Sequence, residues 1–405
     1  MKLDYLKYSV TNLINRKMRS WLTILSILIG IMAIYSLLSF GQGLTVYVDD
    51  IATQMGKDKI TIMPKGAGFA GLDENFRMSE DDVDFIRKRN EITDVVGLYF
   101  DSVEVEYKKE KKYTFAIGVP TGGPEKKLVE EMMTVDMSKG RWLKESDKYK
   151  IMMGYLYQIP NKIFTRPLRI GDKLMLNGEK FEVVGFMGEI GNPQDDSQIY
   201  LTEDMMKEFY EFTDEDVAYM MARVAPDKNP SEIVELIQEK LRKFKGEEKG
   251  KESFEVQTLE DMIAAFGDII LVLNGILIII AMISVVVASV NIMNTMYTAV
   301  LERTKEIGVM KAIGAKNSDI MTIFMIESGL LGLVGGALGI LFGYGVASAG
   351  GAIAAGAGYS FLKPLFPTWL TVGCLLFAFF VGTAAGLFPS INASKLKPVD
   401  SLRYE

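Results

Sequence analysis

Few residue types in this chain can carry catalytic chemistry. The 405 residues include no His and one Cys. This composition excludes His-based acid–base catalysis, His metal ligands, an internal disulfide and a Cys-cluster metal site. Carboxylates are abundant, but they are scattered at the density of ordinary solvated surface, and no nucleophile–base pair accompanies them. An enzymatic function is therefore disfavoured, and we expect no metal or cofactor site in this chain.

The most informative charged residues lie in the stretch VLERTKEIGVMKAIGAKNSDIMTIFMIE at positions 300–327. Three apolar residues recur three positions apart among charges of both signs, which predicts a short amphipathic helix over Lys305–Ile313. Gly314 is a natural helix stop, and we expect Ser318 as the N-cap and Asp319 as the first-turn acid of the next helix. The residues expected to make contacts are Glu302, Arg303, Lys305, Glu306, Ile307, Gly308, Met310, Lys311, Ile313 and Gly314.

Two interpretations of this short helix remain open on physical grounds. It can be a rigid knob that takes a push from a protein partner and passes it to the two long helices beside it. It can also lie in a lipid interface, with its basic residues on anionic headgroups. The mixed signs of the charges favour a protein partner slightly.

Four long charge-free blocks explain a composition that is 49% apolar, with a mean hydropathy of +0.16. Each exceeds the roughly 20 residues that a helix needs to cross a bilayer core. We therefore predict transmembrane helices at 21–44, 269–300, 320–350 and 368–392. A signal peptide is the alternative for the first block, but its apolar core is too long and no prompt A-x-A-like cleavage site follows.

Charge distribution predicts how these helices are oriented. Residues 49–268 carry 32 Lys and Arg against 45 Asp and Glu. Of the 13 basic residues elsewhere, 12 precede the first helix, separate the second from the third, or follow the fourth. Because short cytoplasmic segments collect Lys and Arg, we expect both termini and the 301–317 connection in the cytoplasm. Residues 1–20 would form a cytoplasmic amphipathic segment, 393–405 a cytoplasmic tail, and 45–265 an external domain.

Residues 45–265 alternate strand-like and helix-like patterns. We predict strands at 59–63, 102–107 and 112–118, a hairpin around Asn177-Gly178, and helices starting after Ser79, Asn229 and Thr258. Aromatic residues such as Phe69, Phe76, Trp142, Tyr155 and Tyr157 could line a ligand surface, although core packing is the simpler interpretation. The predicted fold is an α-helical membrane protein with four transmembrane helices plus a large α+β extracytoplasmic domain between helices 1 and 2.

Small and polar residues inside the predicted spans indicate close helix packing. Glycines at three- and four-residue steps let helix backbones approach in lipid, within one subunit or across a dimer, unless they reflect ordinary glycine enrichment of membrane helices. Buried amides need partners and are more typical of interhelical contacts than of a transport site. The residues concerned are Gly335, Gly339, Gly343, Gly382, Gly386, Asn291 and Asn294.

The run NTMYTAVLERTKEIGVMKAIGA at 294–315 closely resembles the cytoplasmic signature of MacB/FtsX-like permeases, the membrane subunits of ABC transporters of the macrolide-exporter and lipoprotein-release class. The tail ASKLKPVDSLRYE at 393–405 and the opening NLINRKMRSWLT at 12–23 are similar to the same family. Weaker similarity to its periplasmic core lies at Gly140–Leu143 and Ile170–Gly185. An FtsX-like permease region is expected at about 275–398.

The resemblance implies a type VII mechanotransmission fold that works as a dimer, with each protomer docked on an ATPase subunit through the Lys305–Ile313 coupling helix. No G-x-x-x-x-G-K-[ST] loop occurs in the sequence, so we expect ATP and Mg to bind in a separate ATPase. An adaptor or channel protein is a further expected partner, beside the lipid bilayer, and no nucleic acid is expected. The alternative is an FtsX-like signalling scaffold that activates an external enzyme without transporting a substrate.

Overall fold

The computed structural model describes residues 17–65, 77–133 and 136–397. Phe69, Phe76, most of the predicted 1–20 segment and the end of the predicted tail lie outside these residues. The described chain divides into two compact units. The helical unit contains the residues up to Leu44, Ile269–Ile353 and those from Leu362 onward. The sheet unit contains Thr45–Asp268 and Ala354–Phe361.

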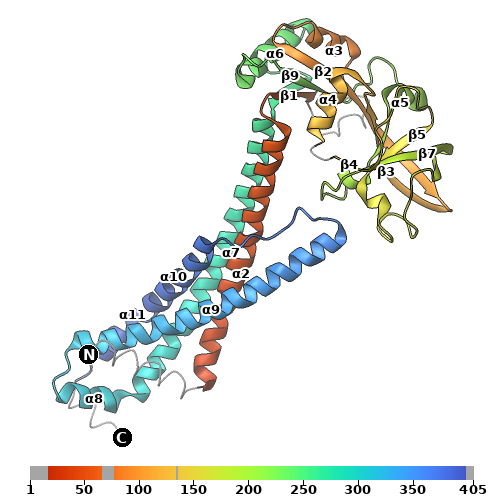
Figure 1. Cartoon of the computed structure of the whole chain (residues 1–405). Helices are drawn as coiled ribbons and strands as arrows, with labels where there is room; N and C mark the ends of the chain where they lie inside the picture. The colour runs from red at the N-terminus through yellow and green to blue at the C-terminus, as the bar shows by residue number, and fades with distance from the viewer. Residues whose placement is uncertain (1–16, 66–76, 134–135, 398–405) are drawn as a thin grey trace. The chain divides into compact units, whose positions relative to one another are not determined.

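Long helices dominate the helical unit (Figure 1). In chain order the described helices of this unit are α2 (Lys17–Met55), α7 (Leu259–Glu302), the short α8 (Thr304–Ala312), α9 (Asn317–Ala357), α10 (Thr368–Ala385) and the short α11 (Leu387–Ser394). Among the described residues, four segments are long and apolar enough to cross a membrane: Thr23–Met55, Ile278–Glu302, Asn317–Ala357 and Thr368–Ala385.

The last predicted span, 368–392, is divided in the structure. Helix α10 ends at Ala385, and α11 begins after Gly386. Pro389 gives the physical reason, because a proline has no amide hydrogen and its ring collides with the carbonyl of the residue four positions earlier, here Ala385. The chain therefore restarts as a separate short helix.

One continuous mixed sheet forms the centre of the other unit, with strand order β10-β1-β9-β2-β3-β8-β5-β7-β4 and β6 paired to both β2 and β7. Strand β2 (Ile92–Tyr107) is long enough to pair antiparallel with β9 through its first half and with β3 through its second half. The other strands are β1 (Lys59–Pro64), β3 (Glu110–Val119), β4 (Met137–Gly140), β5 (Lys150–Met153), β6 (Lys173–Leu176), β7 (Glu179–Met187), β8 (Ile199–Thr202), β9 (Tyr219–Val224) and β10 (Phe254–Thr258).

Local signals in the sequence explain several element boundaries of this unit. Asn177 and Gly178 both have positive φ, at 44° and 89°, and join β6 to β7 in the predicted two-residue turn. Ser79 forms a capping box with Asp82 at the start of α3 (Glu80–Arg87). Thr258 makes the same reciprocal contacts with Asp261 at the start of α7.

Among the described residues of this unit, four helices pack on the sheet. Besides α3 they are α4 (Gly123–Met132), α5 (Glu203–Tyr210) and α6 (Pro230–Lys245). As predicted, α6 begins after Asn229 with a proline in its first turn, and it ends at Gly246 in the left-handed conformation.

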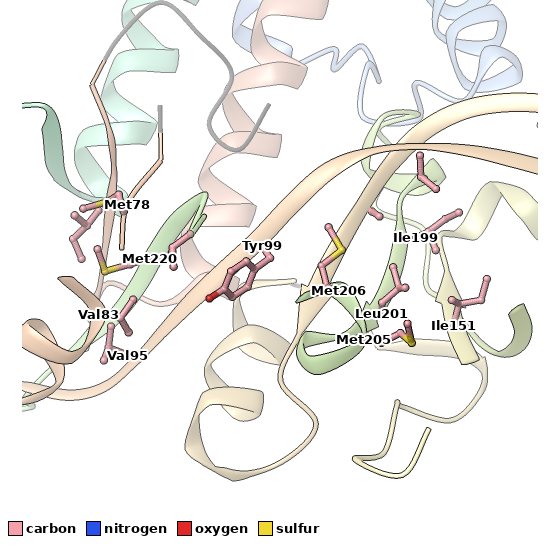
Figure 2. Packing of buried hydrophobic residues seen from close by; sticks show 14 of the residues in the cluster. Met78, Val83, Val95, Tyr99, Ile151, Ile199, Leu201, Met205, Met206 and Met220 are labelled. Carbon is pink, nitrogen blue, oxygen red and sulfur yellow. The ribbon is translucent and has the colours of Figure 1, made fainter. Parts of the chain in front are cut away.

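Large apolar side chains fill the space between the sheet and its helices. Figure 2 shows Met78, Val83, Val95 and Met220 at one end of this cluster and Ile151, Ile199 and Leu201 at the other. Tyr157 is 2% exposed and belongs to the same core, and Trp142 donates its indole N–H to the carbonyl of Pro120 at 3.3 Å. Tyr157 therefore lies in the core, and the partly buried Trp142 packs against a second apolar cluster of the same unit, in line with the simpler interpretation of the sequence.

Candidate functional site

The predicted amphipathic helix is α8, which starts and ends one residue earlier than expected. Arg303 alone separates it from α7, and Gly314 terminates it with a φ of 101°. Helix α9 begins at Asn317, so the prediction of Ser318 as its N-cap is wrong. Instead the Asp319 carboxylate accepts the backbone N–H of Lys316, the residue directly before α9, at 3.0 Å.

A buried ion pair connects the start of α8 to α9. The Nη1 atom of Arg303 lies 2.8 Å from Oε2 of Glu327, and the two side chains are 4% and 8% exposed. The Arg303 guanidinium also lies 6.0 Å from the ring centre of Phe324. Removing one member of such a pair leaves an uncompensated buried charge. The pair therefore holds the residue directly before α8 against α9.

Helix α8 has an inner face that packs on the helical unit. Ile307 is fully buried, Gly308 is buried beside it, and Met310 packs against the same apolar cluster. Lys311 donates from Nζ to the carbonyl oxygens of Ser394 and Leu396 at the end of α11. A cation there satisfies carbonyls that have no partner inside the helix. Lys311 is therefore engaged within the chain.

The outer face of α8 is exposed and partly apolar. Val309 is 50% exposed and Ile313 is 82% exposed. Glu302, Lys305, Glu306 and Gly314 are exposed as well. Ile307, Met310 and Ile313, whose spacing predicted the amphipathic helix, therefore do not share one buried face. A helix turns about 100° per residue, so six positions carry Ile313 roughly 120° away from Ile307.

Glycines in α9 make close contacts with two other helices of the unit. A Cβ added to Gly335, Gly339 or Gly343 would lie within 3.0 Å of an α2 atom: Cβ of Ile27, Cβ of Ile31 and the carbonyl oxygen of Met32, respectively. On another side of α9, a Cβ added to Gly382 of α10 would lie 2.6 Å from the carbonyl oxygen of Ser328. A Cβ added to Gly386 would collide with the Ser328 side chain. In the structure these glycines serve packing within one chain.

The two predicted amides behave differently. Asn291 donates from Nδ2 to Oγ of Ser26 at 2.9 Å, which joins α7 to α2. One turn away, the hydroxyls of Thr23 and Thr295 lie 2.6 Å apart and add a second polar contact between the same helices. The Asn294 side chain is exposed. Only the backbone carbonyl of Asn294 is engaged in the contact with Thr298, whose hydroxyl donates to it at 2.9 Å within α7.

Sequence reasoning missed three partners in this region. Glu327 directly precedes the charge-free block that begins at Ser328, and its acidic side chain inside a predicted span was the available signal. The backbone carbonyls that accept hydrogen bonds from Lys311 could not be predicted from the sequence, because every residue has a backbone carbonyl. Ser26 is one of several hydroxyl residues in its helix, and nothing in the sequence distinguishes it.

Comparison with known proteins identifies the family. A model of the MacB-like periplasmic core domain matches residues 20–240, and a model of the FtsX-like permease C-terminal region matches residues 278–398. An uncharacterized ABC transporter permease of Methanocaldococcus jannaschii, MJ1507, is 32% identical over 99% of this chain and 98% of its own length. This chain belongs to the MacB/FtsX-like permeases of ABC transporters.

Two further relatives show how widely the permease architecture extends. The uncharacterized ABC transporter permease YknZ of Bacillus subtilis is 27% identical over all of this chain and 99% of its own length. The macrolide export ATP-binding/permease protein MacB of Bdellovibrio bacteriovorus is 28% identical over all of this permease, which spans 62% of that relative. Such homologues are permease components, so the family implies an ATPase partner and a multi-pass membrane protein.

Proposed function

We propose that this permease couples ATP hydrolysis by a separate ATPase subunit to movement of its sheet unit, for export or extraction of a substrate. The main support for the proposal is that α8 is fixed on its inner side and exposed on its outer side. Its inner side is fixed by Ile307, by the Arg303–Glu327 pair and by the Lys311 contacts, while its outer side presents Val309 and Ile313 to solvent. A short helix held in this way moves together with α7 and α9 when a partner pushes on it.

Helix continuity supports mechanical transmission toward the sheet unit. Helix α2 continues without a break from the helical unit past Thr45, and α7 likewise crosses the boundary at Ile269. An unbroken helix keeps its backbone hydrogen bonds along its whole length, so a displacement at one end reaches the other. This behaviour is what a mechanotransmission mechanism requires.

The orientation follows from the same proposal. Both termini and the α8 connection face the cytoplasm, where their Lys and Arg residues match the positive-inside rule. The sheet unit then lies outside, ATP and Mg are bound by the partner ATPase, and a second permease copy completes a dimer. An adaptor or channel protein is a further proposed partner, as the resemblance to macrolide exporters suggests.

Charge introduced on the outer face of α8 tests the coupling. We expect Ile313→Asp and Val309→Asp to reduce co-purification of the ATPase and its permease-stimulated ATP turnover at least tenfold. The reason is that a carboxylate in an apolar contact loses its hydration without gaining a partner. Both side chains point to solvent, so the yield and thermal stability of the permease should not change.

A matched control uses Ile170 of the sheet unit, which is 51% exposed. Ile170→Asp makes the same chemical change away from α8 and should leave ATPase binding and turnover intact. Normal stimulated turnover in both α8 variants would contradict the proposal. Stimulated turnover with activation of an external enzyme, but without movement of any substrate, would instead support the signalling scaffold.

A further inference from the structure

The sheet unit contains a largely apolar cavity of about 250 Å³. Its wall is formed by the last turns of α2, by α4, by strands β2, β3, β8 and β9, and by the 190–198 loop. Methionines such as Met133 contribute flexible, polarisable side chains that adapt to a bound shape. The volume lies below the ~300–1,000 Å³ of sites for drug-sized ligands, so an occupant must be compact.

One side chain of this cavity carries a negative charge. Asp195 accepts hydrogen bonds from two neutral amides, Nδ2 of Asn192 at 2.9 Å and Nε2 of Gln198 at 3.1 Å. No Lys or Arg of the described chain pairs with it. Asp147 in the same unit provides the contrast, because it pairs with both Arg141 and Lys150.

The Asp195 side chain is half-buried, and its partial desolvation disfavours the charged form. Desolvation raises the pKa of Asp195 above its ordinary value, and its two amide partners only partly oppose the shift. A cation within a few ångströms would stabilise the charged form. Within the described residues, this half-buried carboxylate therefore has no cationic partner in the cavity wall.

Aromatic rings accompany the carboxylate. Tyr47, Tyr200 and Tyr219 all line the cavity. Burial and the nearby Asp195 charge raise the pKa of Tyr219 to about 12, so this phenol stays neutral at physiological pH. Tyr200 is held by its hydroxyl, 3.2 Å from Oε1 of Gln198. Aromatic faces beside a carboxylate are the surroundings that bind quaternary ammonium groups.

We propose that this cavity binds a compact apolar monocation, with its ammonium group against Asp195 and the tyrosine rings and its hydrocarbon part against the methionine and aliphatic wall. The site lies entirely within the sheet unit and requires neither ATP nor a partner. It therefore goes beyond the coupling function, and either proposal can fail without the other.

The test uses the full chain in detergent and benzyltrimethylammonium as the probe, because this cation combines one ring with one fixed positive charge. Equilibrium dialysis should show saturable binding to the unaltered protein. Asp195→Asn should weaken that binding at least tenfold, while Asp227→Asn, on a carboxylate that is 73% exposed, should not change it. Neopentylbenzene, the uncharged analogue of the same shape, should not displace the probe.

A second variant tests the location independently of the charge. Met133→Trp places a larger side chain in the cavity wall and should abolish binding, with the fold checked by near-UV circular dichroism. The proposal would be overturned if the unaltered protein showed no saturable binding, or if neopentylbenzene displaced the probe. It would also be overturned if Asp195→Asn or a folded Met133→Trp bound the probe with unchanged affinity.

Discussion

In the helical unit the closest helix contacts run through glycines, whereas the sheet unit fills its interior with large side chains. Gly332 of α9 lies so close to α10 that an added Cβ would stand 2.3 Å from the carbonyl oxygen of Ala378. The sheet unit instead buries residues such as Tyr99 and Phe181 almost completely. In water, burying large apolar surface drives packing, but in lipid that force is absent and close backbone approach takes its place.

The two units also use charge differently. The helical unit buries the Arg303–Glu327 pair, in which each ion depends on the other. The sheet unit carries many ion pairs at its surface, and its buried Asp147 is shared between two partly exposed cations. Loss of one charge should therefore cost more in the first unit than in the second, and this difference can be measured.

The largest effect is expected for Arg303→Met. The change leaves the Glu327 carboxylate buried without a partner, and such losses cost about 3–5 kcal/mol. We expect a matching fall in the free energy of unfolding of the helical unit, measured by denaturant titration in detergent. The double variant Arg303→Met with Glu327→Leu should recover most of the loss, since buried ion pairs can be replaced by apolar residues. Equal destabilisation in the double variant would contradict this account.

A somewhat smaller effect is expected for Gly332→Leu. The new side chain has no room between α9 and α10, so the helices must separate at a cost of about 3 kcal/mol. Gly345 lies on the same helix, and nothing stands within 4 Å of its Cβ position. Thermal unfolding followed by circular dichroism should show a lower midpoint for Gly332→Leu only. Helix propensity favours Leu over Gly at both positions, so a similar loss for Gly345→Leu would mean that the contact with α10 does not control the result.

The smallest of these effects concerns Asp147 in the sheet unit. Hydrogen bonds from Arg141, Lys150 and the Lys144 amide hold the pKa of this carboxyl below its ordinary value. Its contribution to stability is therefore present above the unfolded pKa of about 3.9 and is lost as pH falls through the lower folded pKa. We expect Asp147→Asn to cost about 2 kcal/mol at neutral pH and to flatten the acid limb of the stability–pH profile. An unchanged acid limb would contradict the assignment.

Much of the fold could be predicted because its signals are local. Charge-free length predicts helices that can cross a bilayer, and the Asn177-Gly178 pair predicts a turn that only residues tolerant of positive φ adopt readily. Ser79 and Asn229 predict helix starts through hydrogen bonds that span two or three residues. The composition, without His and with one Cys, likewise limits the chemistry of the chain whatever its fold.

Only the tertiary structure decided which residues meet. Arg303 and Glu327 are 24 positions apart, and Lys311 reaches carbonyls more than eighty positions away. The cavity around Asp195 draws its wall from segments scattered between Tyr47 and Met221, and of the singled-out aromatics that the structure describes, Trp142, Tyr155 and Tyr157, none lines it. Local hydrogen bonds and hydropathy are fixed by neighbours along the chain, whereas the partner of a buried charge depends on how distant segments pack.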